Sequence, residues 1–200
     1  RFPPLEAQVA DCADGIAYNA HDLDDGITSG LLNLEQVRKL ALWREHEIEL
    51  DRKYTKLDFK LKKYQIVRQI INDLITDFRQ TTLKNLKANK IKNVDDIRYA
   101  KKRVAGFSSQ MVEKNGELRK FLHRYLYSHR KVKRMEFKSE ICLTELFNAY
   151  TTVPALLPAS VQQKKSDDSI ERRICDYISG MTDRYAIGEY KKLYSPDEKD

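Results

Sequence analysis

Apolar residues recur every three or four positions along several stretches of this sequence, which is the spacing of helices with one buried face. The clearest stripe consists of Val67, Ile70, Ile71, Leu74, Ile75 and Phe78. Later stripes consist of Leu118, Phe121, Leu122, Tyr125 and Leu126, then Met135, Ser139, Cys142, Leu143, Leu146, Phe147 and Tyr150, and finally Ile170, Ile174, Tyr177, Ile178 and Met181. Alternation typical of strands never lasts beyond a few residues, so the sequence predicts an all-α helical bundle.

Capping and breaking residues divide these stripes into separate helices. Ser108 or Ser109 can cap the helix that follows them, because a serine hydroxyl accepts from the free N–H groups of a first turn. Pro154 ends a preceding helix, since proline lacks the N–H donor. Polar composition predicts a loop or frayed end over 84–92 and a loop over 158–166.

The chain is expected to form a single all-helical domain or fragment over 1–200. Within it, 1–30 holds the helix richest in candidate chemistry, 31–195 is the helical remainder and 196–200 is a disordered tail. The sequence starts with Arg1 rather than methionine and leads at once into that helix. It therefore suggests the C-terminal portion of a longer polypeptide.

The first helix, predicted from about Leu5 to Asp25, has two incompatible faces. Its apolar face consists of Val9, Ala13, Ile16, Ala20 and Leu23. The opposite face consists of Asp11, Asp14, Tyr18, His21, Asp22 and Asp25. Carboxylates one turn apart repel each other, and no lysine or arginine occurs between Glu6 and Leu32. A cation or a set of hydrogen-bond donors is therefore expected opposite this stripe.

Bulk charge and cysteine usage narrow the choice of partners and compartment. The net charge of +7 and the isoelectric point of about 9.2 suit either a polyanionic partner or long helices solvated by lysine and arginine. The three cysteines, at positions 12, 142 and 175, suggest buried free thiols in a reducing cytoplasm. No apolar run approaches the length of a membrane span, so we expect a cytoplasmic protein without a membrane partner.

Three motifs resemble one known family. The first is Glu-Ala-Gln-Val-Ala-Asp-x-Ala-Asp-x-Ile-Ala-Tyr-Asn-x-His-Asp-Leu-Asp-Asp-Gly over 6–26. The second contains Lys-Phe-Leu-x-x-x-Leu-Tyr-x-His within 107–132, and the third is Asp-Tyr-Ile-Ser-Gly-Met-Thr-Asp-x-Tyr over 176–185. Together they resemble the dGTPase-like deoxynucleoside triphosphate triphosphohydrolases of the HD-domain superfamily, of which the chain looks like the C-terminal part.

That resemblance implies roles for three residues spaced four apart on the first helix, and hence on one face. Asp14 matches the last aspartate of a metal site that the family builds from two histidines and two aspartates, with Mg²⁺, Mn²⁺ or Fe²⁺ bound. Tyr18 matches a substrate-contacting tyrosine, and Asp22 matches the aspartate that binds the deoxyribose hydroxyl. The alternatives are a surface carboxylate at Asp14, a core position for Tyr18 and an arginine-paired Asp22.

The other family ligands, a first histidine and an adjacent His-Asp pair, have no match in this sequence, and no catalytic residue beyond the metal ligand is identified. The dipeptide at His21 lies after the tyrosine and matches the sugar-binding motif instead. His46 is flanked by glutamates and is expected on a solvated face, while His123 and His129 are expected to pack or cap. The chain alone is therefore expected to lack part of the catalytic site.

The implied function is a metal-dependent dNTP triphosphohydrolase that releases a deoxynucleoside and triphosphate. The resemblance also implies a homo-oligomer, often a hexamer, and binding of single-stranded nucleic acid. The basic segments 52–63 and 130–134 are candidate phosphate contacts by charge density, although a solvated helix face is the favoured interpretation of each individual lysine. The segment 180–183 is interpreted as a helix-to-helix turn. The alternative from another class is a non-catalytic basic helical module that binds nucleic acid or a partner protein.

Overall fold

The computed structural model describes residues 1–162 and 168–198. Within this part of the chain every regular element is helical, which confirms the all-α prediction. The sequence suggests a single domain, whereas the structure divides into two compact units, Arg1–His129 and Arg130–Asp200. Each unit is described by itself.

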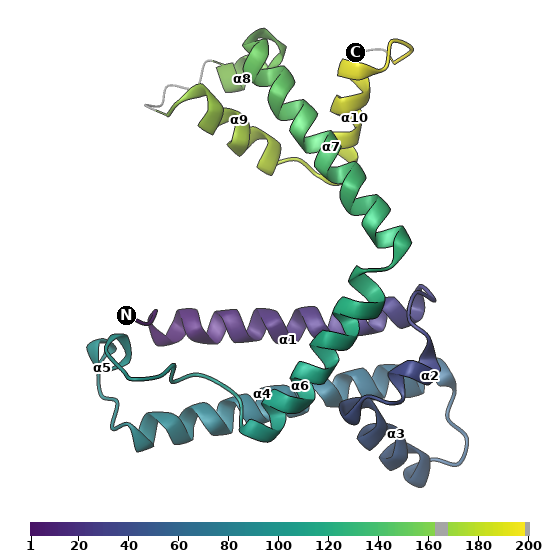
Figure 1. Cartoon of the computed structure of the whole chain (residues 1–200), viewed down its shortest axis with the longest axis vertical. Helices are drawn as coiled ribbons and strands as arrows, with labels where there is room; N and C mark the ends of the chain where they lie inside the picture. Colours follow the sequence, from purple (N-terminus) through teal and green to yellow (C-terminus); the bar gives the residue numbers. More distant parts are fainter. Residues whose placement is uncertain (163–167, 199–200) are drawn as a thin grey trace. The chain divides into compact units, whose positions relative to one another are not determined.

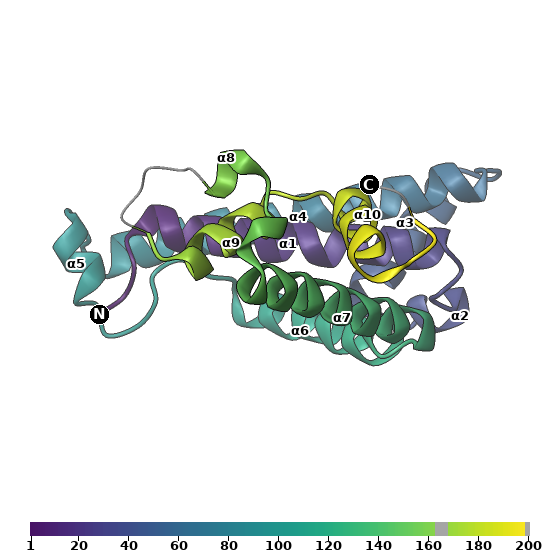
Figure 2. The same ribbon diagram turned by 90° about the horizontal axis from the view of Figure 1, so that it is seen from above.

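The Arg1–His129 unit is built from six α-helices among its residues, followed by one π-helical segment (Figures 1 and 2). The α-helices are α1 (Leu5–Thr28), α2 (Leu34–Val37), α3 (Ala41–Lys53), α4 (Phe59–Ala88), α5 (Val94–Arg98) and α6 (Ser109–Leu122). The π-helical segment, η1, covers His123–Tyr127 and continues directly from α6. Helices α1 and α4 run side by side, and α6 crosses them (Figure 1).

Local capping explains where these helices begin. The Asp58 carboxylate accepts from the amides of Lys60 and Leu61 at the start of α4. The Ser108 hydroxyl accepts from the Met111 amide, as predicted, and caps α6. Such bonds satisfy the first N–H groups of a helix, which have no partner within it.

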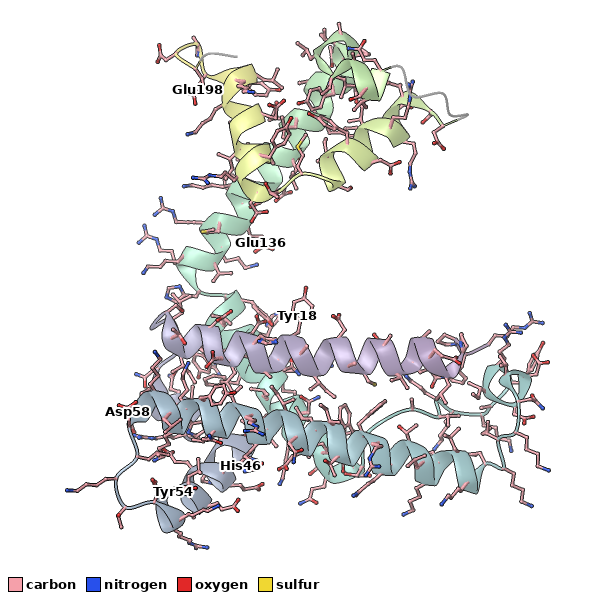
Figure 3. All side chains as sticks on the ribbon, turned by 180° about the vertical axis from the view of Figure 1, so that it is seen from behind. Tyr18, His46, Tyr54, Asp58, Glu136 and Glu198 are labelled. Carbon is pink, nitrogen blue, oxygen red and sulfur yellow. The ribbon has the colours of Figure 1, made fainter. Side chains whose placement is uncertain are left out.

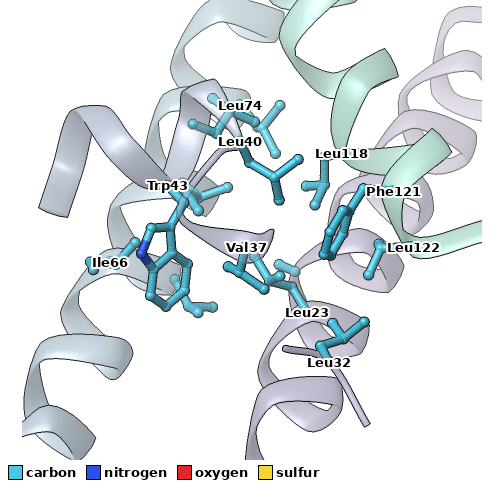
Figure 4. Packing of buried hydrophobic residues seen from close by; sticks show 14 of the residues in the cluster. Leu23, Leu32, Val37, Leu40, Trp43, Ile66, Leu74, Leu118, Phe121 and Leu122 are labelled. Atoms are coloured by element: carbon cyan, nitrogen blue, oxygen red, sulfur yellow. The ribbon is translucent and has the colours of Figure 1, made fainter. Parts of the chain in front are cut away.

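The core of this unit is a cluster of branched and aromatic side chains, most of them from α1, α3, α4 and α6 (Figure 4). Trp43 is fully buried within this cluster. The labelled neighbours in Figure 4 are Leu23, Leu32, Val37, Leu40, Ile66, Leu74, Leu118, Phe121 and Leu122. Burying this apolar area supplies the main driving force for bringing the four helices together.

The buried face of α1 differs in part from the predicted one. Ile16, Ala20 and Leu23 are buried as expected, but Val9 is 39% exposed and Ala13 is exposed. At the amino end of α1 the buried residue is instead a polar one, Gln8, which is completely buried. The apolar face is thus rotated relative to the prediction over the first two turns.

Gln8 can be buried because every hydrogen-bonding end of its side chain is used. Its Oε1 accepts from the amides of Val104 and Ala105, at 3.2 and 3.1 Å, and its Nε2 donates to the carbonyl of Pro3. Buried polar groups are tolerated when they are paired in this way. This side chain therefore holds the connection before α6 against α1.

His46 also lies elsewhere than predicted, since it is only 7% exposed rather than on a solvated face. It projects from α3 towards α4, where its Nε2 lies 3.0 Å from the Asp73 carboxylate (Figure 3). The flanking glutamates in the sequence suggest solvent, but the partner of His46 comes from a different helix. Only tertiary packing reveals the buried position.

The Arg130–Asp200 unit contains α7 (Arg130–Thr152), a 3₁₀ turn η2 (Pro154–Leu156), α8 (Ala159–Gln162), α9 (Ile170–Ser179) and α10 (Asp183–Tyr194). Its core consists of Leu146, Tyr150, Leu157, Ile174 and Ala186. As predicted, α7 ends just before Pro154, and the final helices form a pair. Helices α9 and α10 both pack on α7.

Several loop predictions are wrong in detail. Helix α4 continues to Ala88, so the first half of 84–92 is helical, and α8 occupies part of the predicted loop over 158–166. The rest of that loop from 163 on, and the last two residues of the predicted tail, lie outside the described residues. Cys175 is exposed, and Cys12 and Cys142 are half-buried free thiols, so full burial was wrong for all three.

None of the helices in the described part of the chain combines the length and the apolarity needed to cross a lipid bilayer.

We predict that replacing Gly26 by alanine destabilises the Arg1–His129 unit. A Cβ atom there would lie 2.5 Å from Leu32 Cδ1, and Leu32 is itself buried. Overpacking of this kind costs about 1–3 kcal/mol. At Gly15, in the same helix, a Cβ atom would meet nothing within 4 Å, so Gly15→Ala should stabilise by up to ~1 kcal/mol. Urea unfolding monitored by circular dichroism compares the two variants; equal free energies of unfolding would contradict the packing described.

Candidate functional site

A cleft of about 730 Å³ opens in the Arg1–His129 unit between α1 and α6. Helix α1 contributes, among others, Asp11, Tyr18 and Asn19. Helix α6 and η1 contribute, among others, Asn115, Arg119, Lys120, His123 and Tyr127, and the connection before α6 contributes Arg103 and Phe107. The cleft thus combines cationic, carboxamide and aromatic side chains.

One wall of the cleft carries a ladder that sequence reasoning missed. Arg119, His123 and Tyr127 follow one another at intervals of four residues and all line the cleft. In an α-helix such spacing places side chains on one face, and here the last turn widens into a π-helix. The spacing is visible in the sequence, but the sequence predicts packing or capping for His123 and does not indicate the shared cleft.

The cleft carries more positive than negative charge. Its one lining carboxylate, Asp11, is paired with Arg103, whose Nη2 lies 2.6 Å from Asp11 Oδ2 and also donates to the carbonyl of Gln8. Arg119 and Lys120 form no ion pair with any described residue. Their charges therefore remain available to an anionic ligand.

Asp22 is attached to the cleft through Tyr127. The Tyr127 hydroxyl donates a hydrogen bond to the Asp22 carboxylate. Burial and then this contact with Asp22 raise the pKa of the Tyr127 phenol to about 12. The phenol therefore stays neutral at ordinary pH and remains a hydrogen-bond donor beside the carboxylate.

The three residues predicted to form the site do not have equal environments. Tyr18 lines the cleft with 61% of its surface exposed, on the side of α1 turned away from α4 (Figure 3). Asp22 is half-buried against Tyr127. Asp14 is exposed and is not among the residues that line the cleft. Of the three residues, only Tyr18 lines the cleft; Asp22 does not line it but bonds to Tyr127, which does, and the roles of all three remain predictions.

The acidic stripe on α1 is partly matched by the groups expected opposite it. Asp11 meets Arg103, and Asp22 meets the Tyr127 hydroxyl. Helix α1 also contributes Asp24, which pairs with Lys63 from α4. Donors from other elements thus compensate part of the repulsion along this helix.

Within the described residues, no group of three or more histidine, cysteine, aspartate or glutamate side chains could hold a metal ion. The side chains present therefore do not fit a complete metal centre. Asp14 could supply a single hard oxygen ligand of the kind that Mg²⁺, Mn²⁺ or Fe²⁺ accepts.

The two basic segments considered as candidate phosphate contacts do not line the cleft. In the segment 52–63, Lys62 pairs with Glu47 and Asp51, and Lys63 pairs with Asp24. The segment 130–134 forms the first turn of α7, in the other unit. The cleft instead takes its cations from Arg103, a loop residue without periodic neighbours, and from α6.

The segment 180–183 forms the predicted turn between two helices. Gly180 terminates α9, and the Thr182 hydroxyl accepts from the Tyr185 amide at the start of α10. Tyr185 in turn shares a hydrogen bond with the Tyr177 hydroxyl, at 3.0 Å. These contacts join α9 to α10 and confirm the structural interpretation of this motif.

Comparison with known proteins places the chain beside one group of hydrolases. Residues 105–192 match the family described as phosphohydrolase-associated domain. The chain is similar to proteins named deoxyguanosinetriphosphate triphosphohydrolase-like protein, with 44% identity to that of Geobacter sulfurreducens over 98% of this chain and 51% of the relative. The similarly named protein of Thiobacillus denitrificans is 42% identical over 98% of this chain and 52% of the relative. That of Bordetella pertussis is 41% identical over 96% of this chain and 50% of the relative.

These matches confirm the resemblance that the three sequence motifs indicate. The chain spans about half the length of the curated relatives it matches. The matches with these relatives do not favour the alternative of a non-catalytic module.

We predict that the Tyr127 phenol titrates near pH 12 in the folded chain, against an ordinary pKa of 10.0. Because the folded pKa is raised, the neutral phenol stabilises the fold fully below pH 10, and this contribution disappears as the pH rises through about 12. Carbon-13 NMR of the tyrosine Cζ atoms measures the midpoint. In Asp22→Asn the midpoint should fall but stay above 10, since burial remains. Asp25→Asn on the same helix is the control, and an unshifted midpoint in Asp22→Asn would contradict the assigned contact.

Proposed function

We propose that this chain, a relative of the dGTP triphosphohydrolase-like proteins, forms part of a metal-dependent deoxynucleoside triphosphate triphosphohydrolase. The cleft between α1 and α6 would hold the dNTP. The reaction is hydrolysis at the α-phosphate, with release of a deoxynucleoside and inorganic triphosphate. The observation that supports this proposal is that one cleft contains both unpaired cations and aromatic rings. Tyr18 lines this cleft, and Asp22 bonds to Tyr127 at its wall.

The charges and rings of the cleft suit the parts of a nucleotide. Arg119 and Lys120 would bind the phosphate chain, since guanidinium and ammonium groups form strong charge-assisted hydrogen bonds with phosphate oxygens. The Tyr18 ring would pack on the sugar. The Asp22 carboxylate, held by Tyr127, would accept a hydrogen bond from the 3′-hydroxyl. A carboxylate fixed in this way favours one orientation of the deoxyribose.

Asp14 is proposed as one metal ligand, together with ligands that this sequence does not contain. The bound Mg²⁺, Mn²⁺ or Fe²⁺ would polarise the α-phosphate and lower the pKa of an attacking water. Asp14 lies one turn before Tyr18 on α1, so a ligand held there would adjoin a nucleotide that Tyr18 contacts.

Two further properties are proposed for the whole protein. One is a homo-oligomer, hexameric as the resemblance implies. The other is binding of single-stranded nucleic acid, for which the first turns of α7 offer Arg134, Lys138 and the exposed ring of Phe137. Basic side chains beside an exposed aromatic ring suit a phosphate backbone with stacked bases.

We predict that Arg119→Gln weakens binding of dGTP to the chain about tenfold or more, because a charge-assisted contact to phosphate is lost. Arg124→Gln is the matched control: it removes the same charge from η1, but Arg124 packs over the Tyr125 ring and is not among the residues lining the cleft. Its effect should stay within about twofold. Isothermal titration calorimetry measures both. Equal losses in the two variants would show that dGTP responds only to overall charge and would refute the assigned cleft.

We also predict that Asp14→Asn reduces the gain in dGTP affinity that Mn²⁺ produces. Loss of the charged oxygen ligand weakens metal binding while leaving the cations of the cleft in place. Asp25→Asn, which alters another exposed carboxylate later on α1, should keep the full gain. The measurement is the ratio of dGTP dissociation constants with and without Mn²⁺. The same ratio in both variants and the unaltered chain would contradict a metal-binding role for Asp14.

A further inference from the structure

Two carboxamides face each other inside the cleft. Asn19 on α1 is only 7% exposed, and its Nδ2 donates to Oδ1 of Asn115 on α6, at 2.9 Å. Both residues line the cleft. Neither is needed to close the apolar core, whose members are hydrocarbon and aromatic side chains. Asn115 is half-buried, so the pair has one buried and one half-buried member, and its place in the cleft needs a chemical explanation.

The bond between the two carboxamides leaves each of them incomplete. A carboxamide has two N–H donors and one oxygen that can accept twice. No other described residue bonds to either side chain, so Asn19 Oδ1 and Asn115 Nδ2 keep unused capacity. Exchanging the nitrogen and oxygen positions of both amides would reverse the order but would still leave one acceptor beside one donor. The pair thus offers a mixed hydrogen-bonding edge in either assignment.

A mixed edge of this kind suits a nucleobase better than a phosphate. Phosphate oxygens accept hydrogen bonds, and the cations Arg119 and Lys120 already offer them donors. The acceptor on Asn19 would find no hydrogen-bond donor on a fully ionised phosphate group. A base such as guanine instead places an acceptor, O6, next to a donor, N1–H, and carboxamides pair with base edges in just this two-point manner.

Aromatic surface lies close to the pair. Tyr18 precedes Asn19 on α1, and Phe107 lines the same cleft. Rings of this type provide a stacking surface for a planar base. The edge and the face of a base would therefore both find partners in one cavity.

We infer that the Asn19–Asn115 pair is a specificity element that binds the hydrogen-bonding edge of the nucleobase. This inference rests on the proposed function, in that it takes the cleft to be a nucleotide site. It adds that the base, and not only the sugar and phosphates, is recognised by this chain. The residues concerned lie on the two helices that frame the cleft.

The test is Asn115→Leu, which has similar volume and removes the donor and the acceptor together. Two probes are titrated into the chain by calorimetry: dGTP, and inorganic tripolyphosphate, which has the phosphates but no base. We expect about a tenfold loss of dGTP affinity, with tripolyphosphate affinity changed less than about twofold. Retained tripolyphosphate binding also shows that the variant is folded. Gln110→Leu, an exposed amide on α6 that is not among the residues lining the cleft, is the matched control.

Other outcomes decide against the inference. If dGTP affinity is unchanged, or if dGTP and tripolyphosphate weaken by the same factor, the pair does not read the base. If Asn115→Leu does not fold, Asn115→Ala is measured in its place with the same expectations. If the unaltered chain binds neither probe, the proposed function fails first and the inference fails with it, a result distinct from the loss of base recognition alone.

Discussion

One face of helix α1 is buried in the hydrophobic core, and this burial fixes the direction in which the other faces of the helix point. Ile16, Ala20 and Leu23 are almost entirely removed from water against α4 and α6. A helix that is fixed along such a stripe cannot rotate without exposing it, at a cost of about 1.5–3 kcal/mol for each large apolar side chain. The neighbouring face, with Asp11, Tyr18 and Asp22, is thereby held beside α6.

The cleft follows from that orientation and from a few long-range polar contacts. Buried Gln8 binds the backbone before α6, so that Arg103 reaches Asp11 and Phe107 reaches the cleft. Asn19 meets Asn115 across the cleft. With Asp11 neutralised, the remaining charge of Arg119 and Lys120 makes the cleft suited to an anion, and the acidic character of α1 in the sequence no longer argues against a phosphate ligand.

Periodic features of the fold could be predicted from the sequence, because local geometry determines them. The stripe from Val67 to Phe78 identified α4, and Ser108 was recognised as a cap. Features that depend on distant partners could not be predicted. Val9 is apolar and is therefore expected to be buried, yet the buried residue is Gln8, whose Oε1 accepts from amides almost a hundred residues away.

The same division holds for the candidate site. The ladder of Asp14, Tyr18 and Asp22 is a spacing and was legible in the sequence. The facing ladder on α6 has equal spacing, but its residue types also suit packing, and only the cleft shows that Arg119 and His123 share a space with Tyr18. Arg103 lies in a connection with no periodicity at all, and no sequence pattern marked it.

The proposed function requires that a deoxynucleoside triphosphate binds in the cleft between α1 and α6. A crystal structure of the chain with dGTP tests it most directly. We expect phosphate oxygens within hydrogen-bonding distance of the Arg119 guanidinium and the sugar beside Tyr18 and Asp22. A nucleotide bound elsewhere, for example on the basic first turns of α7, with the cleft holding only water, would contradict it.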